Sequence, residues 1–317
     1  MKIIEIKGLK THFKTTKGTV KAVNGVSFAI EQGKAMGLVG ESGCGKTTIG
    51  LSILKLLPSN GMIVDGQILF CGDDLVPKSE KEMNEFRWNG ISMIFQAAMN
   101  AMNPVYRVED QIVEAIRAHE KVTKDGAMER VGPLLELVGM DPAVGHQYPH
   151  ELSGGMKQRS IIAMALACNP KFIIADEPTT ALDVMVQDKI LREIRALQKK
   201  LNMTMMYISH DISVITETCD DIAIMYGGNL VEYTDTMTLF EKPLHPYTQA
   251  LMGAFPSIKG EKTVLKSVPG EPPVLLDPPP GCRFHPRCPF ANGGCKNATP
   301  EFREVEKGHW VSCSNIG

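Results

Sequence analysis

Residues 40–47 read Gly-Glu-Ser-Gly-Cys-Gly-Lys-Thr, the eight-position pattern of a phosphate-binding loop. An apolar run, Ala35 to Val39, precedes the pattern, and we expect a helix to begin at its end. Glycines let such a loop wrap phosphates, because its N–H groups and the helix N-terminus then face the negative charge. A Gly-rich turn that matches by chance is the alternative, and the strand, helix and Lys-Thr pair disfavour it. Lys46 is expected to reach the β- and γ-phosphates of a nucleotide, and Thr47 to ligate Mg²⁺. The predicted nucleotide-binding residues of this loop are Gly40, Ser42, Gly43, Cys44, Gly45, Lys46, Thr47 and Thr48.

An acidic pair follows a second apolar run. Phe172 to Ala175 is continuously apolar, as a strand buried on both faces should be, and Asp176 and Glu177 come directly after it. A carboxylate at the end of a strand facing a phosphate loop can hold magnesium through water, which is the role we predict for Asp176. Glu177 is predicted to position or deprotonate the attacking water. Many strands end in acidic residues, so this pair gains its meaning from the phosphate loop that precedes it.

A third motif lies between these two. Residues 152–158, Leu-Ser-Gly-Gly-Met-Lys-Gln, resemble the signature motif of the ABC ATPase family, which other phosphate-loop enzymes lack. Ser153 and the amides of Gly154 and Gly155 would begin a helix and form a second anion-binding terminus. A serine that merely caps a helix explains Ser153 alone. The resemblance implies that this motif, with Gln158, closes over the ATP held by a second ABC ATPase subunit.

Four single residues extend the resemblance. Gln96 matches the glutamine that senses Mg²⁺ and contacts the membrane subunits, and His210 matches the switch histidine near the γ-phosphate. Together with Glu177 they form the predicted catalytic set. Asp183 matches the loop through which two subunits sense each other. Phe13 lies where the family places an aromatic ring on adenine, although Phe13 could equally belong to the core.

Three longer segments resemble the oligopeptide/dipeptide branch of ABC importers: residues 175–184, 244–251 and 282–289. The resemblance implies ATP-driven import of di- or oligopeptides by a homo- or heterodimer of motor subunits. The dimer would dock on two membrane permeases, which receive substrate from an extracytoplasmic peptide-binding protein. Nickel or sugars are other solutes of related motors. Departures are Ala97-Ala98 in place of Asp-Pro, Cys44 in place of Ser and Phe13 in place of Tyr.

Two other functions fit the motifs less well. A soluble ABC ATPase acting on ribosomes or DNA would carry a second cassette or long coiled coils, and the sequence has neither. A regulatory subunit that binds ATP without hydrolysing it would not need Glu177 and His210. The net charge of −2 gives no electrostatic footprint for nucleic acid.

The expected fold class is α/β. It comprises a phosphate-loop ABC ATPase core with an antiparallel β subdomain, an inserted α-helical subdomain and a small cysteine-rich C-terminal extension. We assign residues 1–255 to the ATPase domain, with the helical subdomain at about 97–165, and residues 256–317 to a proline-rich linker and a metal-binding extension. Strands are expected at 91–95, 172–175 and 203–209, and a helix where apolar residues recur between Val186 and Leu201.

No apolar run reaches the roughly 18 to 20 residues of a membrane span, and the N-terminus lacks the pattern of a signal peptide. We therefore expect a peripheral protein on the cytoplasmic face of the cell membrane.

The C-terminal segment concentrates four cysteines, Cys282, Cys288, Cys295 and Cys313, separated by five, six and seventeen residues. So short a segment is too small to fold on a core of its own, and small segments of this kind usually need a metal or disulfides. The cytosol disfavours disulfides. Structural zinc sites favour cysteine pairs only two to four residues apart. We therefore predict a [4Fe–4S] cluster on these four thiols, with Zn²⁺ as the alternative and four unligated thiols as the third possibility.

Overall fold

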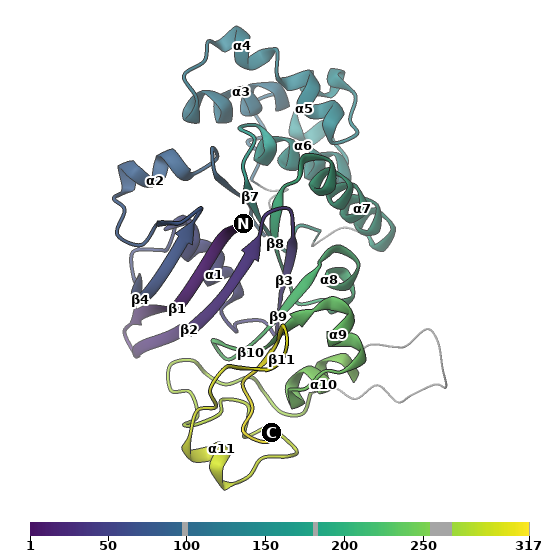
Figure 1. Ribbon diagram of the computed structural model, residues 1–317. Helices are drawn as coiled ribbons and strands as arrows, with labels where there is room; N and C mark the ends of the chain where they lie inside the picture. The colour runs from purple at the N-terminus through teal and green to yellow at the C-terminus, as the bar shows by residue number, and fades with distance from the viewer. Residues whose placement is uncertain (97–100, 180–182, 254–267, 317) are drawn as a thin grey trace. The chain divides into compact units, whose positions relative to one another are not determined.

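The computed structural model describes residues 1–96, 101–179, 183–253 and 268–316 (Figure 1). The chain divides into two compact units. The first comprises Met1–Ile4, Ile30–Ala35 and Leu69–Ile208, and the second comprises Glu5–Ala29, Met36–Ile68 and Ser209–Gly317. The predicted boundary between residues 255 and 256 and the start of the predicted helical subdomain at residue 97 lie outside the described residues.

Three parallel strands form the centre of the first unit: β6 (Ile91–Ile94), β7 (Phe172–Asp176) and β8 (Thr204–Ser209), in the order β6-β7-β8. Every residue of β7 and β8 is buried, which is why their sequences are continuously apolar rather than alternating. The predicted strands are confirmed here, with two corrections at their ends. Met203 precedes β8, which begins at Thr204. Phe95 lies beyond β6 and is 44% exposed, because the chain leaves the sheet after Ile94.

Helices surround these strands. They are α2 (Glu80–Phe86), α3 (Val108–His119), α4 (Lys124–Met128), α5 (Val131–Leu137), α6 (Gly154–Leu166) and α7 (Val184–Leu201), with 3₁₀ turns at Pro142–His146 and Pro149–Glu151. The predicted helix between Val186 and Leu201 is confirmed as α7. Its apolar stripe is buried at Ile190, Leu191, Ile194 and Leu197, whereas Leu201 is exposed at the end of the helix.

Two sheets organise the second unit. Strands β1 (Lys2–Thr15), β2 (Gly18–Glu31) and β4 (Gly61–Phe70) form one sheet in the order β2-β1-β4. The last two residues of β4 belong to the first unit, where they pair antiparallel with β5 (Asp73–Asp74). The other sheet runs β3-β9-β10-β12-β11. Its strands are β3 (Ala35–Val39), β9 (Asp221–Tyr226), β10 (Asn229–Asp235), β11 (Arg303–Glu306) and β12 (His309–Val311). Strands β3 and β9 are parallel, and the remaining pairs are antiparallel.

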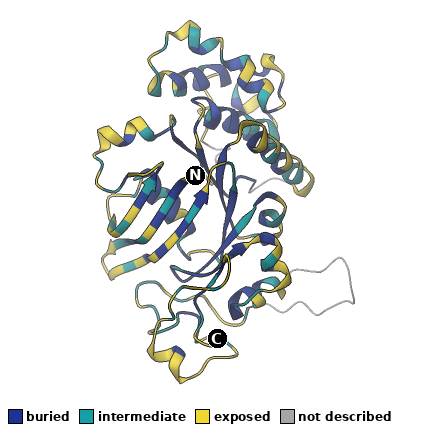
Figure 2. Cartoon of the chain, viewed as in Figure 1, coloured by how far each residue is buried: buried dark blue, intermediate teal, exposed yellow. Residues whose placement is uncertain are grey.

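The helices of the second unit are α1 (Lys46–Leu54), α8 (Ile212–Thr218), α9 (Thr236–Glu241), α10 (Pro246–Gly253) and α11 (Gly293–Asn297). Figure 2 shows buried residues along β3 and β9 and mostly exposed ones along α11.

Residues 268–316, which we call the tail, share a sheet with the preceding part of the second unit, which we call the core. Strand β12 pairs with β10 through Glu232↔Val311 and Tyr233↔Trp310. The tail's Phe284 is 1% exposed and lies in an aromatic cluster with Tyr226, Tyr247 and His245. The tail therefore obtains from the core the apolar cover that so short a segment cannot build alone.

Candidate nucleotide site and tail cavity

The phosphate loop joins β3 to α1 in the second unit, which confirms the predicted strand–loop–helix. All five residues of β3 are buried, and α1 begins at Lys46. Gly40 has no room for a side chain, since a Cβ there would lie 2.2 Å from the Met225 carbonyl oxygen. Gly45 has a φ of +106°, and a Cβ on it would lie 2.2 Å from the Ala22 carbonyl oxygen. The loop can close this tightly only with glycine at both positions.

Lys46 is held inside this loop and is 6% exposed. Its Nζ donates to the carbonyl oxygens of Gly40 at 2.7 Å and Glu41 at 3.1 Å, and lies 3.8 Å from the Sγ of Cys44. Burial raises the pKa of the Cys44 thiol, against the opposing effect of the Lys46 ammonium. Cys44 therefore acts as a small neutral side chain, and the positive charge of the loop comes from Lys46.

Glu177 and Gln96 meet in the first unit, at the end of β7. The Gln96 Nε2 donates to the Glu177 Oε2 at 2.8 Å, and Asp176, the last residue of β7, is 1% exposed. Glu177 has a φ of +47°, and its amide donates to the Ile208 carbonyl oxygen at 2.9 Å. Left-handed backbone at a non-glycine residue costs roughly 1–3 kcal/mol and is common at active sites. No pattern in the sequence indicated this left-handed backbone, and the hydrogen bond from Gln96 holds the Glu177 carboxylate.

The signature residues begin α6, also in the first unit. The Ser153 Oγ accepts from the Met156 amide at 3.3 Å, and Ser153 is exposed. A Cβ on Gly155 would lie 3.2 Å from the Val186 side chain, so a larger residue would crowd α7. Gln158 is 3% exposed, which places its side chain within the fold of this unit. Ser153 and Gly154 are therefore the residues of this motif that are exposed at the N-terminus of α6.

The remaining predicted residues take the following places. The Asp183 carboxylate caps α7 by accepting from the Val186 amide at 3.0 Å. His210 follows β8 directly and precedes the cap of α8. Phe13 is half-buried on β1, with its ring 2.7 Å from where a Cβ on Gly61 would lie. Thr47 and Thr48 lie in the first turn of α1. Ala97-Ala98 and residues 180–182 lie outside the described residues.

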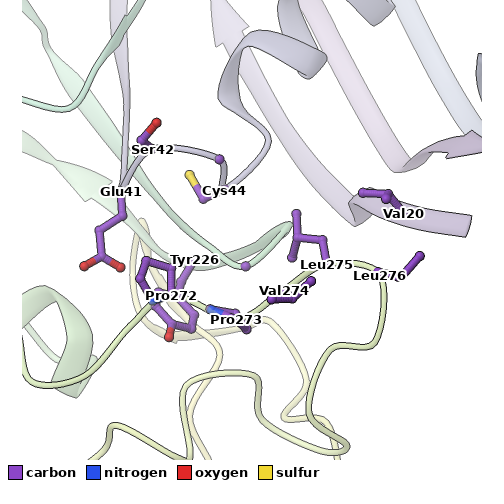
Figure 3. Close-up of a pocket in the computed structure, with 12 residues that line it drawn as sticks. Val20, Glu41, Ser42, Cys44, Tyr226, Pro272, Pro273, Val274, Leu275 and Leu276 are labelled. Carbon is purple, nitrogen blue, oxygen red and sulfur yellow. The ribbon is translucent and has the colours of Figure 1, made fainter. Parts of the chain in front are cut away.

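A cavity of about 300 Å³ lies beside the phosphate loop (Figure 3). Its walls are residues 41–44, Val20, Tyr226, Gly227 and residues 272–276 of the tail. The Lys21 amide donates to the Leu275 carbonyl oxygen at 3.0 Å, which joins this part of the tail to β2. We expected these prolines to form a linker, but residues 272–276 form one wall of a cavity at the phosphate loop. The proline content predicted an extended segment, but it could not predict that this segment would lie beside the phosphate loop.

The four tail cysteines line a second, small cavity together with His245, Phe284 and His285. All four are free thiols. Burial raises the pKa of Cys282, Cys288 and Cys313, with smaller contributions from the neighbouring thiols. Among the residues that the structure describes, however, no three His, Cys, Asp or Glu side chains are placed to hold a metal ion. The arrangement thus gathers the predicted cysteines without forming a metal-binding group.

The phosphate loop closed by Gly40 and Gly45, and the strand that ends at Asp176 with Glu177 directly after it, define a phosphate-loop nucleotide-binding protein. Sequence comparison narrows this class. Residues 23–180 match the ABC transporter family, and residues 231–295 match the oligopeptide/dipeptide transporter C-terminal region. The chain belongs to the ABC transporter family, in the group that carries this C-terminal region, and it is an ABC-type ATPase.

Named relatives resemble the chain along nearly its whole length. It is 43% identical to the dipeptide transport ATP-binding protein DppD of Bacillus subtilis, over 98% of this chain and 94% of that protein. It is 44% identical to the oligopeptide transport ATP-binding protein OppD of the same organism, over 98% and 88%. The dimeric structure of MJ0796, a bacterial ABC transporter cassette, matches with a TM-score of 0.65 at 25% identity, over 74% of this chain and 98% of that one. No helix in the described ranges has the length and hydropathy that crossing a bilayer requires.

Proposed function

We propose that this chain is the ATP-hydrolysing subunit of an importer of di- or oligopeptides, bound peripherally to the cytoplasmic face of the cell membrane. The names of the relatives support the peptide substrate, and they do not favour a soluble ABC ATPase with a non-transport target. The hydrogen bond between Gln96 and Glu177 carries the hydrolytic part of the proposal, because it orients a carboxylate that can position or deprotonate the attacking water.

Each residue has a role in the proposed reaction. The amides of residues 43–48 and the Lys46 ammonium bind the phosphates at the N-terminus of α1. The Thr47 hydroxyl and the Asp176 carboxylate offer the oxygen ligands that Mg²⁺ prefers. When bound there, Mg²⁺ neutralises the charge that develops on the phosphates. Glu177 orients the water or takes its proton, with Gln96 holding the Glu177 carboxylate.

The proposal extends to assembly. Ser153, Gly154 and Gly155 would face the nucleotide of a second ABC ATPase subunit, and the buried Gln158 would support them from within α6. Asp183 would lie beside that contact, His210 near the γ-phosphate and Phe13 against the adenine ring. The exposed Ser153 hydroxyl at a helix N-terminus supports this arrangement. ATP would then close the two subunits and hydrolysis would part them. Two permeases, which receive peptide from an extracytoplasmic binding protein, would follow that movement.

Glu177→Gln tests the hydrolytic role. The amide keeps an oxygen for the Gln96 hydrogen bond but loses the basic carboxylate, so ATP should still bind while kcat falls by about 10²–10⁴-fold. The matched control is Glu193→Gln, which removes a carboxylate that pairs with Arg159 elsewhere in the first unit. That control should leave kcat near the wild-type value. Undiminished hydrolysis in Glu177→Gln would contradict the assignment.

We also propose that the tail cysteines hold a [4Fe–4S] cluster as a structural group. Its support is that Cys282, Cys288, Cys295 and Cys313 line one cavity although they are spread along the tail. A zinc ion draws four sulfurs to about 2.3 Å from a single centre, whereas each cysteine of a cluster binds a different iron. The gaps of five, six and seventeen residues between these cysteines favour the cluster over zinc. Anaerobic purification followed by iron, sulfide and zinc analysis tests this. A result of one zinc per chain and no iron would show a zinc site in place of the cluster. A protein that contains no metal would refute the proposal.

A further inference from the structure

The tail places an arginine on the phosphate loop. Arg287 donates from Nη1 to the Glu41 Oε2 at 2.6 Å and from Nη2 to the Glu41 Oε1 at 3.0 Å, a bidentate pair. Glu41 is the second residue of the loop, and 246 positions separate the partners in the sequence. The Arg287 side chain is 5% exposed and that of Glu41 is 26% exposed. This ion pair is therefore largely shielded from solvent and is screened less than a surface pair.

The guanidinium is itself fixed from several sides. Its Nε donates to the Pro269 carbonyl oxygen at 2.6 Å, and Nη2 also lies 3.3 Å from the Val268 carbonyl oxygen. Nη1 lies 3.3 Å from the Tyr226 hydroxyl oxygen, over whose ring the guanidinium is placed. The bond to Glu41 is the largest of the causes that raise the pKa of Arg287. An arginine held by two tail carbonyls and a core tyrosine forms a rigid support for Glu41.

Glu41 places a negative charge in the loop that we propose binds the phosphates of a nucleotide. Figure 3 shows the Glu41 side chain directed toward Tyr226 and Pro272, while Ser42 points the other way. Without Arg287, the Glu41 carboxylate would add an unpaired negative charge beside the phosphates, and like charges near a protein surface repel substantially. The bidentate arginine both cancels this charge and fixes its direction.

We propose that Arg287 is a positioning residue for the phosphate loop: it holds and neutralises Glu41 so that the loop accepts the phosphates of a nucleotide. The inference rests on the proposed nucleotide site. It gives the tail a part in ATP binding, in addition to any metal the tail holds.

The test measures the affinity of the purified full-length chain for AMP-PNP with Mg²⁺ by isothermal titration. Arg287→Ala should weaken binding about tenfold, because the Glu41 carboxylate loses its partner. Glu41→Gln alone should bind within about twofold of wild type, because no repelling charge is created. The double variant Arg287→Ala/Glu41→Gln should recover most of the lost affinity, since it contains no free carboxylate.

Lys242→Ala is the matched control. It breaks a different ion pair between the core and the tail, Lys242 with Glu306, whose side chains are both exposed. This variant should bind as wild type does. If Arg287→Ala does not fold, Arg287→Lys replaces it. We expect that variant to weaken binding about threefold, with the same recovery on addition of Glu41→Gln, because lysine keeps the charge but not the bidentate geometry.

Wild-type affinity in the Arg287 variant would overturn the proposal. So would a weakening that Glu41→Gln does not relieve, because a purely structural role in the tail cannot be rescued from the loop. Lys46→Ala separates this inference from the function beneath it. Unchanged binding in Lys46→Ala would refute the nucleotide site itself, whereas lost binding there with normal binding in Arg287→Ala refutes only the role of Arg287.

Discussion

Replacing Glu232 with alanine should detach the tail from the core. Glu232 lies on β10 with its side chain 0% exposed. Its carboxylate accepts from the Leu244 amide at 2.7 Å, from the His245 amide at 2.9 Å and pairs with the His309 Nε2 at 2.7 Å. One buried side chain thus joins β10, the start of α10 and strand β12 of the tail.

The expected cost follows from what Glu232→Ala leaves behind. Two backbone amides and one imidazole N–H lose their acceptor, and each unsatisfied buried group costs about 1–3 kcal/mol. Water entering the space can restore part of this, so we expect a loss of about 3–5 kcal/mol in the free energy of unfolding, the range for breaking a buried pair. Hydrogen exchange should rise first in β12, because β12 is held to the core by a short ladder.

Urea unfolding followed by circular dichroism measures the loss, and hydrogen exchange read by mass spectrometry locates it. Glu306→Ala is the control, since it removes a tail carboxylate that is exposed and pairs with Lys242. The control should leave the urea midpoint unchanged. A loss below about 1 kcal/mol in Glu232→Ala, the size typical of a single ordinary hydrogen bond, would refute the reasoning.

Two further perturbations test local features. Gly40→Ala would place a Cβ 2.2 Å from the Met225 carbonyl oxygen and 2.8 Å from the Cys44 Sγ. Backbone cannot yield as a side chain can, so this variant should lose about 1–3 kcal/mol and its nucleotide affinity, as seen in thermal unfolding with and without AMP-PNP. Burial, with a contribution from Glu120, raises the pKa of Cys168 to about 12, so its thiol stays protonated as pH rises until that value. Iodoacetamide at pH 8 should modify the exposed Cys71 and spare Cys168, and rapid labelling of Cys168 would contradict this environment.

The features that could be predicted from sequence are those whose causes lie within a short stretch of chain. The phosphate loop needs its glycines because neighbouring carbonyls crowd them, and the strand that ends at Asp176 is apolar because it is buried on both faces. The glycine spacing of the loop and the apolar run of the strand can both be seen directly in the sequence. The roles assigned to His210, Asp183 and Phe13 stay predictions, since they concern a nucleotide and a second subunit.

Other features could not be predicted, because they depend on which distant segments meet. The contact of Gln96 with Glu177 depends on the pairing of β6 with β7, and the left-handed backbone of Glu177 depends on the Ile208 carbonyl oxygen beside it. Arg287 reads as an ordinary charged residue between a proline and a cysteine. Its pairing with Glu41 depends on the fold of the tail, and no pattern in the sequence indicates that fold.

The antiparallel pairing of β12 with β10 affects how this protein behaves when it is shortened. In the second unit β11 is the outer strand, with the sequence Arg-Glu-Val-Glu, and charged side chains discourage pairing with other molecules. A chain ending before the tail would instead present β10, Asn-Leu-Val-Glu-Tyr-Thr-Asp, as an open and far more apolar edge. Such an edge is a template for aggregation. Strand β12 therefore covers an edge of β10 that removal of the tail would leave open.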